Sequence, residues 1–260
     1  MRVIKVLMVV LFVFFYCGLY SSVVYELDFA RNTAILVPTL AIGGYSFIRT
    51  YNQTGLSVFE LEELSKYNIN RIDRFAVYNY CERAMQQSDF LLYACIIAPF
   101  LLNISNEMSH EIVEMNTIIA QSFLVTVAIS QLTKTMFLRN RPLAYNDKVP
   151  LNVRQNKDAR YSFISAHTSL AFTGSVLAAK LYDDFHPDKN NTWMYASAVT
   201  VASTVGYLRI KAGKHFLTDV LAGAVVGAGS ALLMTEVHKK RNNGKRDEEI
   251  TVPLVFRVWF

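Results

Sequence analysis

Long apolar stretches are the feature that most restricts the fold of this 260-residue sequence, which is 52% hydrophobic. Most of them are as long as a helix, and several contain no Asp, Glu, Lys or Arg. They lie at about 3–25, 33–48, 90–102, 117–133, 164–181, 193–208 and 217–235. Because a helix of about 20 apolar residues crosses a bilayer, they predict an all-α, polytopic transmembrane bundle of about six core helices. The stretch at 90–102 is short for a span but can extend back through Met85.

The last three stretches are rich in small residues and include Gly223 and Gly227, four residues apart. Small residues let helices approach closely within a membrane. A tightly packed soluble bundle would use the same composition, so this feature leaves both environments open.

The length allows one domain, which we place at residues 26–236. Residues 1–25 have the pattern of a signal peptide or of an N-terminal membrane anchor. Residues 237–260 form a basic tail with a short apolar C-terminus that alternates in strand fashion. Residues 50–89 read as an amphipathic connector, and 143–162 as a polar loop.

The net charge is +5, but basic and aromatic residues are not interleaved, so nucleic acid is not an expected partner. The cysteines Cys17, Cys81 and Cys95 are odd in number and lack the spacing of a metal site or disulfide framework. We expect them to be free thiols.

The basic tail favours a cytoplasmic C-terminus. Counting crossings back from it puts loops 134–163 and 209–216 on the extracytoplasmic side. If 3–25 and 33–48 both cross the membrane, the N-terminus lies outside, which disagrees with the positive charges of Arg2 and Lys5. Whether 33–48 crosses the membrane therefore stays open.

Three short polar segments stand at the ends of apolar stretches, at 134–142, 163–169 and 209–219. Together they supply three cations, two imidazoles, a carboxylate and a hydroxyl. These are Lys134, Arg141, Arg209, His167, His215, Asp219 and Ser165. Arg contacts oxyanions through two N–H groups and Lys through a point charge, so the set suits a bound phosphate.

The two histidines fit two different roles in phosphoryl transfer. His215 and Asp219 are four residues apart and share a face if the segment is helical. A carboxylate beside an imidazole fixes its tautomer, and histidine can form covalent intermediates. His167 could then protonate the leaving oxygen and later activate water.

The pattern Lys-(six residues)-Arg-Pro, Ser-x-His, Arg-(five residues)-His-(three residues)-Asp resembles that of the type-2 phosphatidic acid phosphatase superfamily, over about residues 72–236. That superfamily includes bacterial acid phosphatases, glucose-6-phosphatase and vanadium haloperoxidases, so the resemblance implies an acid phosphatase/vanadium haloperoxidase-like helical fold. It implies His215 as nucleophile, Asp219 as its orienting partner and His167 as general acid and base. It also implies no metal or other cofactor, and a phosphate held by Lys134, Arg141, Ser165, the N–H of Ala166 and Arg209.

The second and third motifs each depart from the family pattern next to these residues. Ala166 stands where the family has Gly, and Ile164 where it has Pro. Leu208 replaces the Ser before Arg209, which removes one hydroxyl donor. Neither departure removes the nucleophile, its partner or the acid.

Each residue also has a plainer interpretation. Lys134, Arg139 and Arg141 flank an apolar segment, where cations commonly snorkel to the membrane surface. His110, His186 and His238 lie outside the motifs, and we expect them at the surface.

The expected protein is a phosphatase that hydrolyses a phosphate monoester or pyrophosphate of a membrane lipid through a phosphohistidine. We expect it in a bacterial inner membrane, among membrane lipids, with a periplasmic site. Phosphatidate, phosphatidylglycerophosphate, polyprenyl pyrophosphate and lipid A phosphate all fit. The alternatives are a soluble periplasmic acid phosphatase, a vanadate-dependent haloperoxidase, and a non-catalytic lipid-binding membrane protein.

Overall fold

The computed structural model describes residues 24–240. The predicted signal peptide or anchor lies almost wholly outside the described residues, as do Cys17 and the apolar C-terminus at 251–260. Within them, Cys81 and Cys95 are free thiols, as predicted.

Six helices of at least 20 residues build the described part of the protein. They are α2 (Phe29–Tyr51), α4 (Glu82–Leu101), α5 (Ile112–Met136), α7 (Ala166–Phe185), α8 (Thr192–Lys211) and α9 (Leu217–His238). Two short helices, α3 (Val58–Glu62) and α6 (Leu151–Arg154), lie in the connections together with several single 3-10 turns. The predicted all-α bundle of about six core helices is therefore confirmed.

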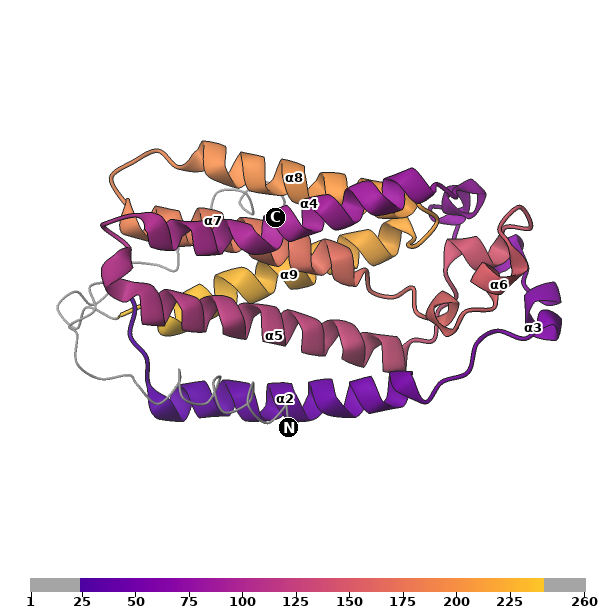
Figure 1. Ribbon diagram of the computed structural model, residues 1–260, viewed down its shortest axis with the longest axis horizontal. Coiled ribbons are helices and arrows are strands. Elements are labelled where there is room, and N and C mark those ends of the chain that lie inside the picture. The colour runs from indigo at the N-terminus through magenta and orange to yellow at the C-terminus, as the bar shows by residue number, and fades with distance from the viewer. Residues whose placement is uncertain (1–23, 241–260) are drawn as a thin grey trace.

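Helix α7 occupies the centre of the bundle and packs against α4, α5, α8 and α9. Its residues Ala171, Leu177 and Leu181 are fully buried. Helix α2 packs on the outside of α5 and runs along the full length of the bundle (Figure 1). It begins at Asp28, whose side chain accepts a hydrogen bond from the Arg31 N–H at 2.7 Å, a typical N-cap.

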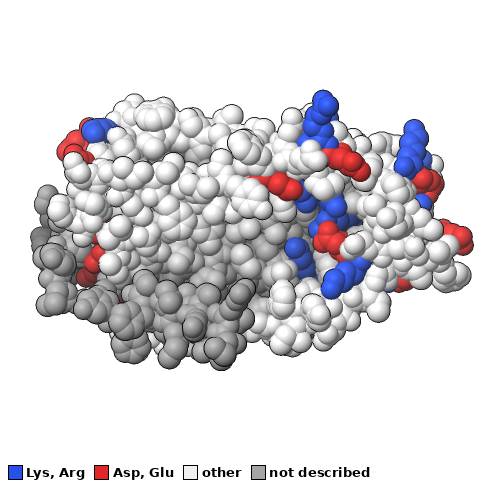
Figure 2. Space-filling view, viewed as in Figure 1, with Lys and Arg blue, Asp and Glu red and all other residues white. Residues whose placement is uncertain are grey.

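Three helical segments of the described residues are long and apolar enough to cross a bilayer: Glu82–Ile104, Ser109–Met136 and Leu217–His238. On the face shown in Figure 2, charged side chains gather toward the two ends and leave a wide band without charge. Large apolar side chains such as Phe90 of α4 and Val225 of α9 are exposed, each 73%. Lipid is the environment that suits so much exposed apolar surface, and the protein is a polytopic membrane protein.

Helices α7 and α9 approach closely at two glycines. A Cβ atom at Gly223 would lie 2.8 Å from the Ser165 carbonyl oxygen, and one at Gly227 would overlap the carbonyl oxygen of Ser169. Small residues therefore serve the close helix packing that the sequence predicts. The contact also holds the N-terminal ends of both helices together, and these ends carry motif residues.

Gly227→Val should destabilise the protein by about 1–3 kcal/mol, because the added atoms force α7 and α9 apart. Thermal unfolding in detergent would measure the loss as a lower Tm. Gly229→Val is the matched control on the same helix, since a Cβ atom at Gly229 would meet nothing within 4 Å. Equal Tm values for both variants would contradict the close approach.

The end of the bundle opposite the motifs contains a buried polar cluster. Asp184 pairs with Lys180 at 2.7 Å and Lys239 at 2.6 Å, and accepts a hydrogen bond from the Tyr25 hydroxyl at 2.7 Å. His238 is fully buried there, so its predicted surface position is wrong. The segment around Tyr25 pairs with the end of α9 and covers it. His186 is half-buried beneath Tyr182, whereas His110 is exposed as predicted.

Candidate active site

All the predicted site residues lie at one end of the bundle, where α5 and α8 end and α7 and α9 begin (Figure 1). Lys134 is in the last turn of α5, and Arg209 is in the last turn of α8. His167 and Asp219 are in the first turns of α7 and α9. The backbone N–H of Ser165 donates to the carbonyl oxygen of Asp219 at 3.1 Å, which joins the second and third motifs.

The turn after α8 brings the first and third motifs together. Gly213 has φ +70°, in the left-handed region that glycine adopts readily. Its carbonyl oxygen accepts a hydrogen bond of 2.9 Å from the N–H of Leu143, just after the Arg141–Pro142 pair. The turn therefore fixes His215, two residues on, against the loop that carries Arg141.

His215 is buried, with 2% of its surface exposed. Its Nδ1–H donates to the carbonyl oxygen of Ser162 at 2.7 Å. Nε2 is then left unprotonated, the form that attacks phosphorus. Burial, together with the positive charges of Arg141 and Arg209, lowers the pKa of His215 to about 3, against the opposing effect of Asp219. The ring is therefore neutral at neutral pH.

Asp219 lies close to His215 but forms no direct hydrogen bond with its ring. Its Oδ2 is 3.8 Å from His215 Nδ1, and accepts hydrogen bonds from the Ser162 hydroxyl at 2.5 Å and the Phe216 N–H at 2.8 Å. Ser162 thus contacts both members of the pair, through its carbonyl oxygen and its hydroxyl.

Arg139 holds this carboxylate in place. It forms ion pairs with Asp219 and, at 2.7 Å, with Asp73, and both carboxylates are almost completely buried. Asp73 also accepts hydrogen bonds from the N–H and hydroxyl of Thr218 at 3.0 and 2.6 Å. Arg139 is a structural cation of the site, which differs from the plainer interpretation of a cation at the membrane surface.

The three predicted phosphate-binding cations differ in their partners. Arg141 binds Asp158 with two contacts, 2.6 and 2.9 Å. Arg209 donates to Ser88 at 3.3 Å and Asp89 at 3.4 Å, and its buried Nε has no partner in the described part of the chain. Lys134 likewise has no ion pair or hydrogen bond among residues 24–240. Donors remain free for an anionic ligand.

A fourth cation, Lys214, stands directly before the nucleophile. Burial and the charges of Arg141 and Arg209 lower the pKa of its ammonium group, and Asp158 opposes the shift. Burial raises the pKa of Asp158, but the charges of Arg141, Lys214 and Lys134 outweigh it and lower that pKa overall. Asp158 therefore interacts with several positive charges of the site at once.

His167 is the second residue of α7, and its Nε2 lies 2.9 Å from Asp89 Oδ1. Ser165 caps this helix, since its hydroxyl oxygen accepts from the Thr168 N–H at 3.4 Å. The first N–H groups of a helix have no partner within it and favour anions. Ala166, at the first helical position, offers its N–H in this way, so the exchange of Gly for Ala keeps the donor.

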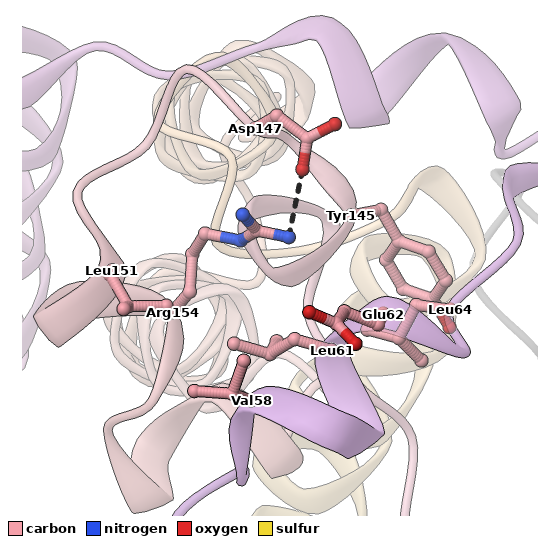
Figure 3. Close-up of a pocket in the computed structure, with 8 residues that line it drawn as sticks. All are labelled: Val58, Leu61, Glu62, Leu64, Tyr145, Asp147, Leu151 and Arg154. Atoms are coloured by element: carbon pink, nitrogen blue, oxygen red, sulfur yellow. Dashed lines mark ion pairs between the residues drawn. The ribbon is translucent and has the colours of Figure 1, made fainter.

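Among residues 24–240, no group of three or more His, Cys, Asp or Glu side chains could hold a metal ion. A separate hollow of about 430 Å³ lies between α3 and the loop after Arg141 (Figure 3). It contains the ion pair between Arg154 and Asp147, 3.0 Å apart. None of the predicted site residues lines it, and the ring of its Tyr145 packs against Phe216, just after His215.

Sequence reasoning missed Asp73, Asp89 and Asp158. Each is an isolated acid in a connector, a loop or the second turn of a helix and beyond, with no spacing that ties it to a motif. The carbonyl oxygen of Ser162 has no sequence signature either. Among the residues that were missed, only Arg139 could have been predicted from the sequence, because it lies between Lys134 and Arg141 and is therefore close to the same site.

Comparison with known proteins agrees with the motifs. Residues 116–243 match the model of the PAP2 superfamily. Undecaprenyl-diphosphatase of Sulfolobus acidocaldarius is 25% identical over 116 residues, which are 45% of this chain and 52% of that protein. Lipid A 4'-phosphatase of Porphyromonas gingivalis is 35% identical over 105 residues, which are 38% of this chain and 39% of that protein.

A similar solved structure is a transmembrane PAP2-type phosphatidylglycerolphosphate phosphatase from Bacillus subtilis. It is 19% identical, with a TM-score of 0.45, over 80% of this chain and 90% of that one. The chain spans about half the length, or less, of the two curated relatives named above. The resemblance to the type-2 phosphatidic acid phosphatase superfamily is confirmed by the family match over the segment that carries all three motifs.

Proposed function

We propose that the protein is a phosphatase that removes phosphate from a membrane lipid through a phosphohistidine at His215. The observation that carries the proposal is the hydrogen bond from His215 Nδ1 to the Ser162 carbonyl oxygen. It fixes a neutral imidazole with a free Nε2 beside Arg141 and Arg209, whose charges act on the ring. A nucleophile among cations suits an anionic phosphate.

The reaction proceeds in two steps. His215 Nε2 forms a bond to phosphorus while the bond from phosphorus to the lipid oxygen breaks, and His167 gives its proton to that oxygen. Water then attacks the phosphohistidine and loses a proton to His167, which releases phosphate and restores His215. Lys134, Arg141 and Arg209 stabilise the charge on the transferring group throughout. Burial and the charge of Arg209 lower the pKa of His167 to about 4, and Asp89, 2.9 Å away, opposes this shift and so favours the charged imidazole that the first step requires.

The substrate class follows from where the site lies. It stands at the end of a bundle whose helices carry wide apolar surfaces, at the level where lipid head groups meet water. Relatives named for a prenyl diphosphate and for lipid A phosphate support an anionic lipid. We place the site on the extracytoplasmic side of an inner membrane, in keeping with the basic C-terminal tail.

Phosphate release by the purified protein from phosphatidate, phosphatidylglycerophosphate, polyprenyl pyrophosphate and lipid A phosphate tests this function. At least one should be hydrolysed by the wild type and none by His215→Ala. Absence of phosphate release from every lipid, with retained binding, would favour a lipid-binding protein. Recovery of the protein in the soluble fraction after carbonate extraction would favour a periplasmic acid phosphatase.

Phosphate release should be unchanged by a chelator such as EDTA, because fixed cations supply the charge that a metal brings in other phosphatases. Orthovanadate should inhibit, since it adopts the five-coordinate shape of the transferring group and such mimics bind tightly. Loss of activity in EDTA and its return with a divalent ion would overturn metal independence. A peroxide and halide assay with vanadate tests the haloperoxidase alternative, and no oxidation is expected.

A further inference from the structure

Asp158 pairs with Arg141 in the same way that an arginine pairs with a phosphate. Its two oxygens contact the two terminal nitrogens of the guanidinium group, Oδ2 to Nη1 at 2.6 Å and Oδ1 to Nη2 at 2.9 Å. Arginine holds carboxylates and phosphates alike through this planar, two-contact arrangement. The carboxylate therefore occupies the face of Arg141 that a phosphate would use.

The other contacts of Arg141 restrict its movement. Its Nε donates to the carbonyl oxygen of Tyr161 at 3.3 Å, and its backbone N–H donates to the carbonyl oxygen of Ala159 at 2.7 Å. The Arg141 side chain is 6% exposed, whereas that of Asp158 is 54% exposed. Asp158 thus lies on the solvent side of the pair, and it is the partner that has room to move.

Asp158 also interacts with the other cations of the site. Burial raises the pKa of its carboxyl group, but the charges of Arg141, Lys214 and Lys134 lower that pKa overall. Burial and the charge of Arg141 lower the pKa of Arg209 to about 10, and Asp158 opposes this shift. The carboxylate is therefore close to the charges that we assign to phosphate binding.

Buried cations this close together repel one another, and an anion among them offsets the repulsion. Asp158 supplies one negative charge, and a phosphate dianion would supply two. The two anions cannot share one guanidinium fork, and they repel each other. Phosphate can therefore take both terminal nitrogens of Arg141 only when the carboxylate leaves them, and the carboxylate can return when phosphate departs.

We propose that Asp158 competes with the phosphate group for Arg141 and so sets how tightly the site holds substrate and product, an inference that rests on the proposed function. The apparent affinity for a ligand falls in proportion to the fraction of protein that is competent to bind it. Asp158 on Arg141 lowers this fraction, and its return assists the release of phosphate. The alternative is a positioning role, in which Asp158 holds Arg141 for the phosphate and its removal weakens binding.

Asp158→Asn separates these two roles, because it removes the charge and keeps the size of the side chain. We expect the variant to bind inorganic phosphate at least about tenfold more tightly than the wild type, the scale of one hydrogen bond between charged groups. Equilibrium dialysis of radioactive phosphate against the protein in detergent measures the Kd. The Ki of phosphate as a product inhibitor of lipid hydrolysis should fall by the same factor.

Asp147→Asn is the matched control on the same polar loop. Asp147 is 91% exposed and pairs with Arg154 at 3.0 Å, beside the hollow of Figure 3. Because salt screens an exposed charge, this variant should bind phosphate within about twofold of the wild type. Weaker or unchanged binding by Asp158→Asn would overturn the competition. An equal gain in Asp147→Asn would attribute the effect to net charge and would overturn it as well.

Labelling of carboxyl groups in the wild-type protein tests the same movement without a variant. Carbodiimide with glycine ethyl ester modifies accessible carboxyl groups, and peptide mass spectrometry measures each of them. Saturating inorganic phosphate should increase the labelling of Asp158, because the carboxylate leaves its cation, and should leave the labelling of Asp147 unchanged. Constant or reduced labelling of Asp158 would overturn the proposal.

Neither phosphate binding nor labelling needs turnover, so this inference and the proposed function can fail separately. Tighter phosphate binding by Asp158→Asn in a protein that hydrolyses no lipid phosphate would support the competition and contradict the phosphatase. Lipid phosphate hydrolysis by the wild type, together with weaker phosphate binding by the variant, would support the phosphatase and overturn the competition.

Discussion

His215→Ala should lose turnover by at least about 10⁴-fold on every phosphate substrate, the scale seen when a covalent nucleophile is removed. The structure provides no substitute within residues 24–240. His167 is bound to Asp89, and the other described histidines lie outside the motif-bearing end. Steady-state phosphate release measures the effect, and an unchanged Tm would show that the fold is intact.

His167→Ala should behave differently, because its role depends on the leaving group. A lipid oxygen is a poor leaving group and needs a proton, so lipid hydrolysis should fall by about 10²–10⁴-fold. An aryl phosphate needs little proton assistance, so the variant should still transfer its phosphoryl group to His215. Equal losses of phosphoenzyme formation in both variants with the aryl substrate would contradict the separate roles.

Arg139→Ala should destabilise the protein by about 3–5 kcal/mol, the range for breaking a buried ion pair on one side. The Arg139 side chain is 27% exposed, but Asp73 and Asp219 are 1% and 0% exposed, and both would lose their cation. Chemical or thermal unfolding in detergent measures the loss. Activity should fall as well, because Asp219 and Ser162 position the nucleophile.

Two variants identify the cause. Asp73→Asn removes one of the two carboxylates and should recover part of the stability of Arg139→Ala, since one fewer buried charge is left unpaired. Arg139→Lys keeps the charge but cannot contact both carboxylates with a planar fork. It should therefore fall between wild type and Arg139→Ala. If Arg139→Ala unfolds like the wild type, the structural role of Arg139 is contradicted and its interpretation as a cation at the membrane surface is favoured.

The sequence was sufficient to predict the long helices and the end of the bundle at which the site residues meet. Apolar stretches of helical length predict the long helices, and the loops that carry Arg141 and His215 lie at one end of these helices. The polar loop at 143–162 holds only short helices and turns, as its composition indicates, whereas the last part of the connector at 50–89 belongs to α4, which begins at Glu82.

Contacts that depend on tertiary packing were beyond prediction. The partner of His215 Nδ1 is a backbone carbonyl, which any residue at 162 could supply. Asp73 reaches Arg139 across 66 positions of sequence, and no periodicity connects them. His238 ends an apolar helix like a surface residue, yet the segment around Tyr25 buries it.

The most direct test of the account is to map the covalent intermediate in His167→Ala. The variant is mixed with an aryl phosphate and quenched in alkali, where phosphohistidine is stable. The removal of His167 also slows the attack of water, so the adduct should accumulate. Mass spectrometry should place one phosphate on His215, lost on acidification and absent from the His167→Ala/His215→Ala double variant. A phosphate on any other residue, or one stable to acid, would contradict the account.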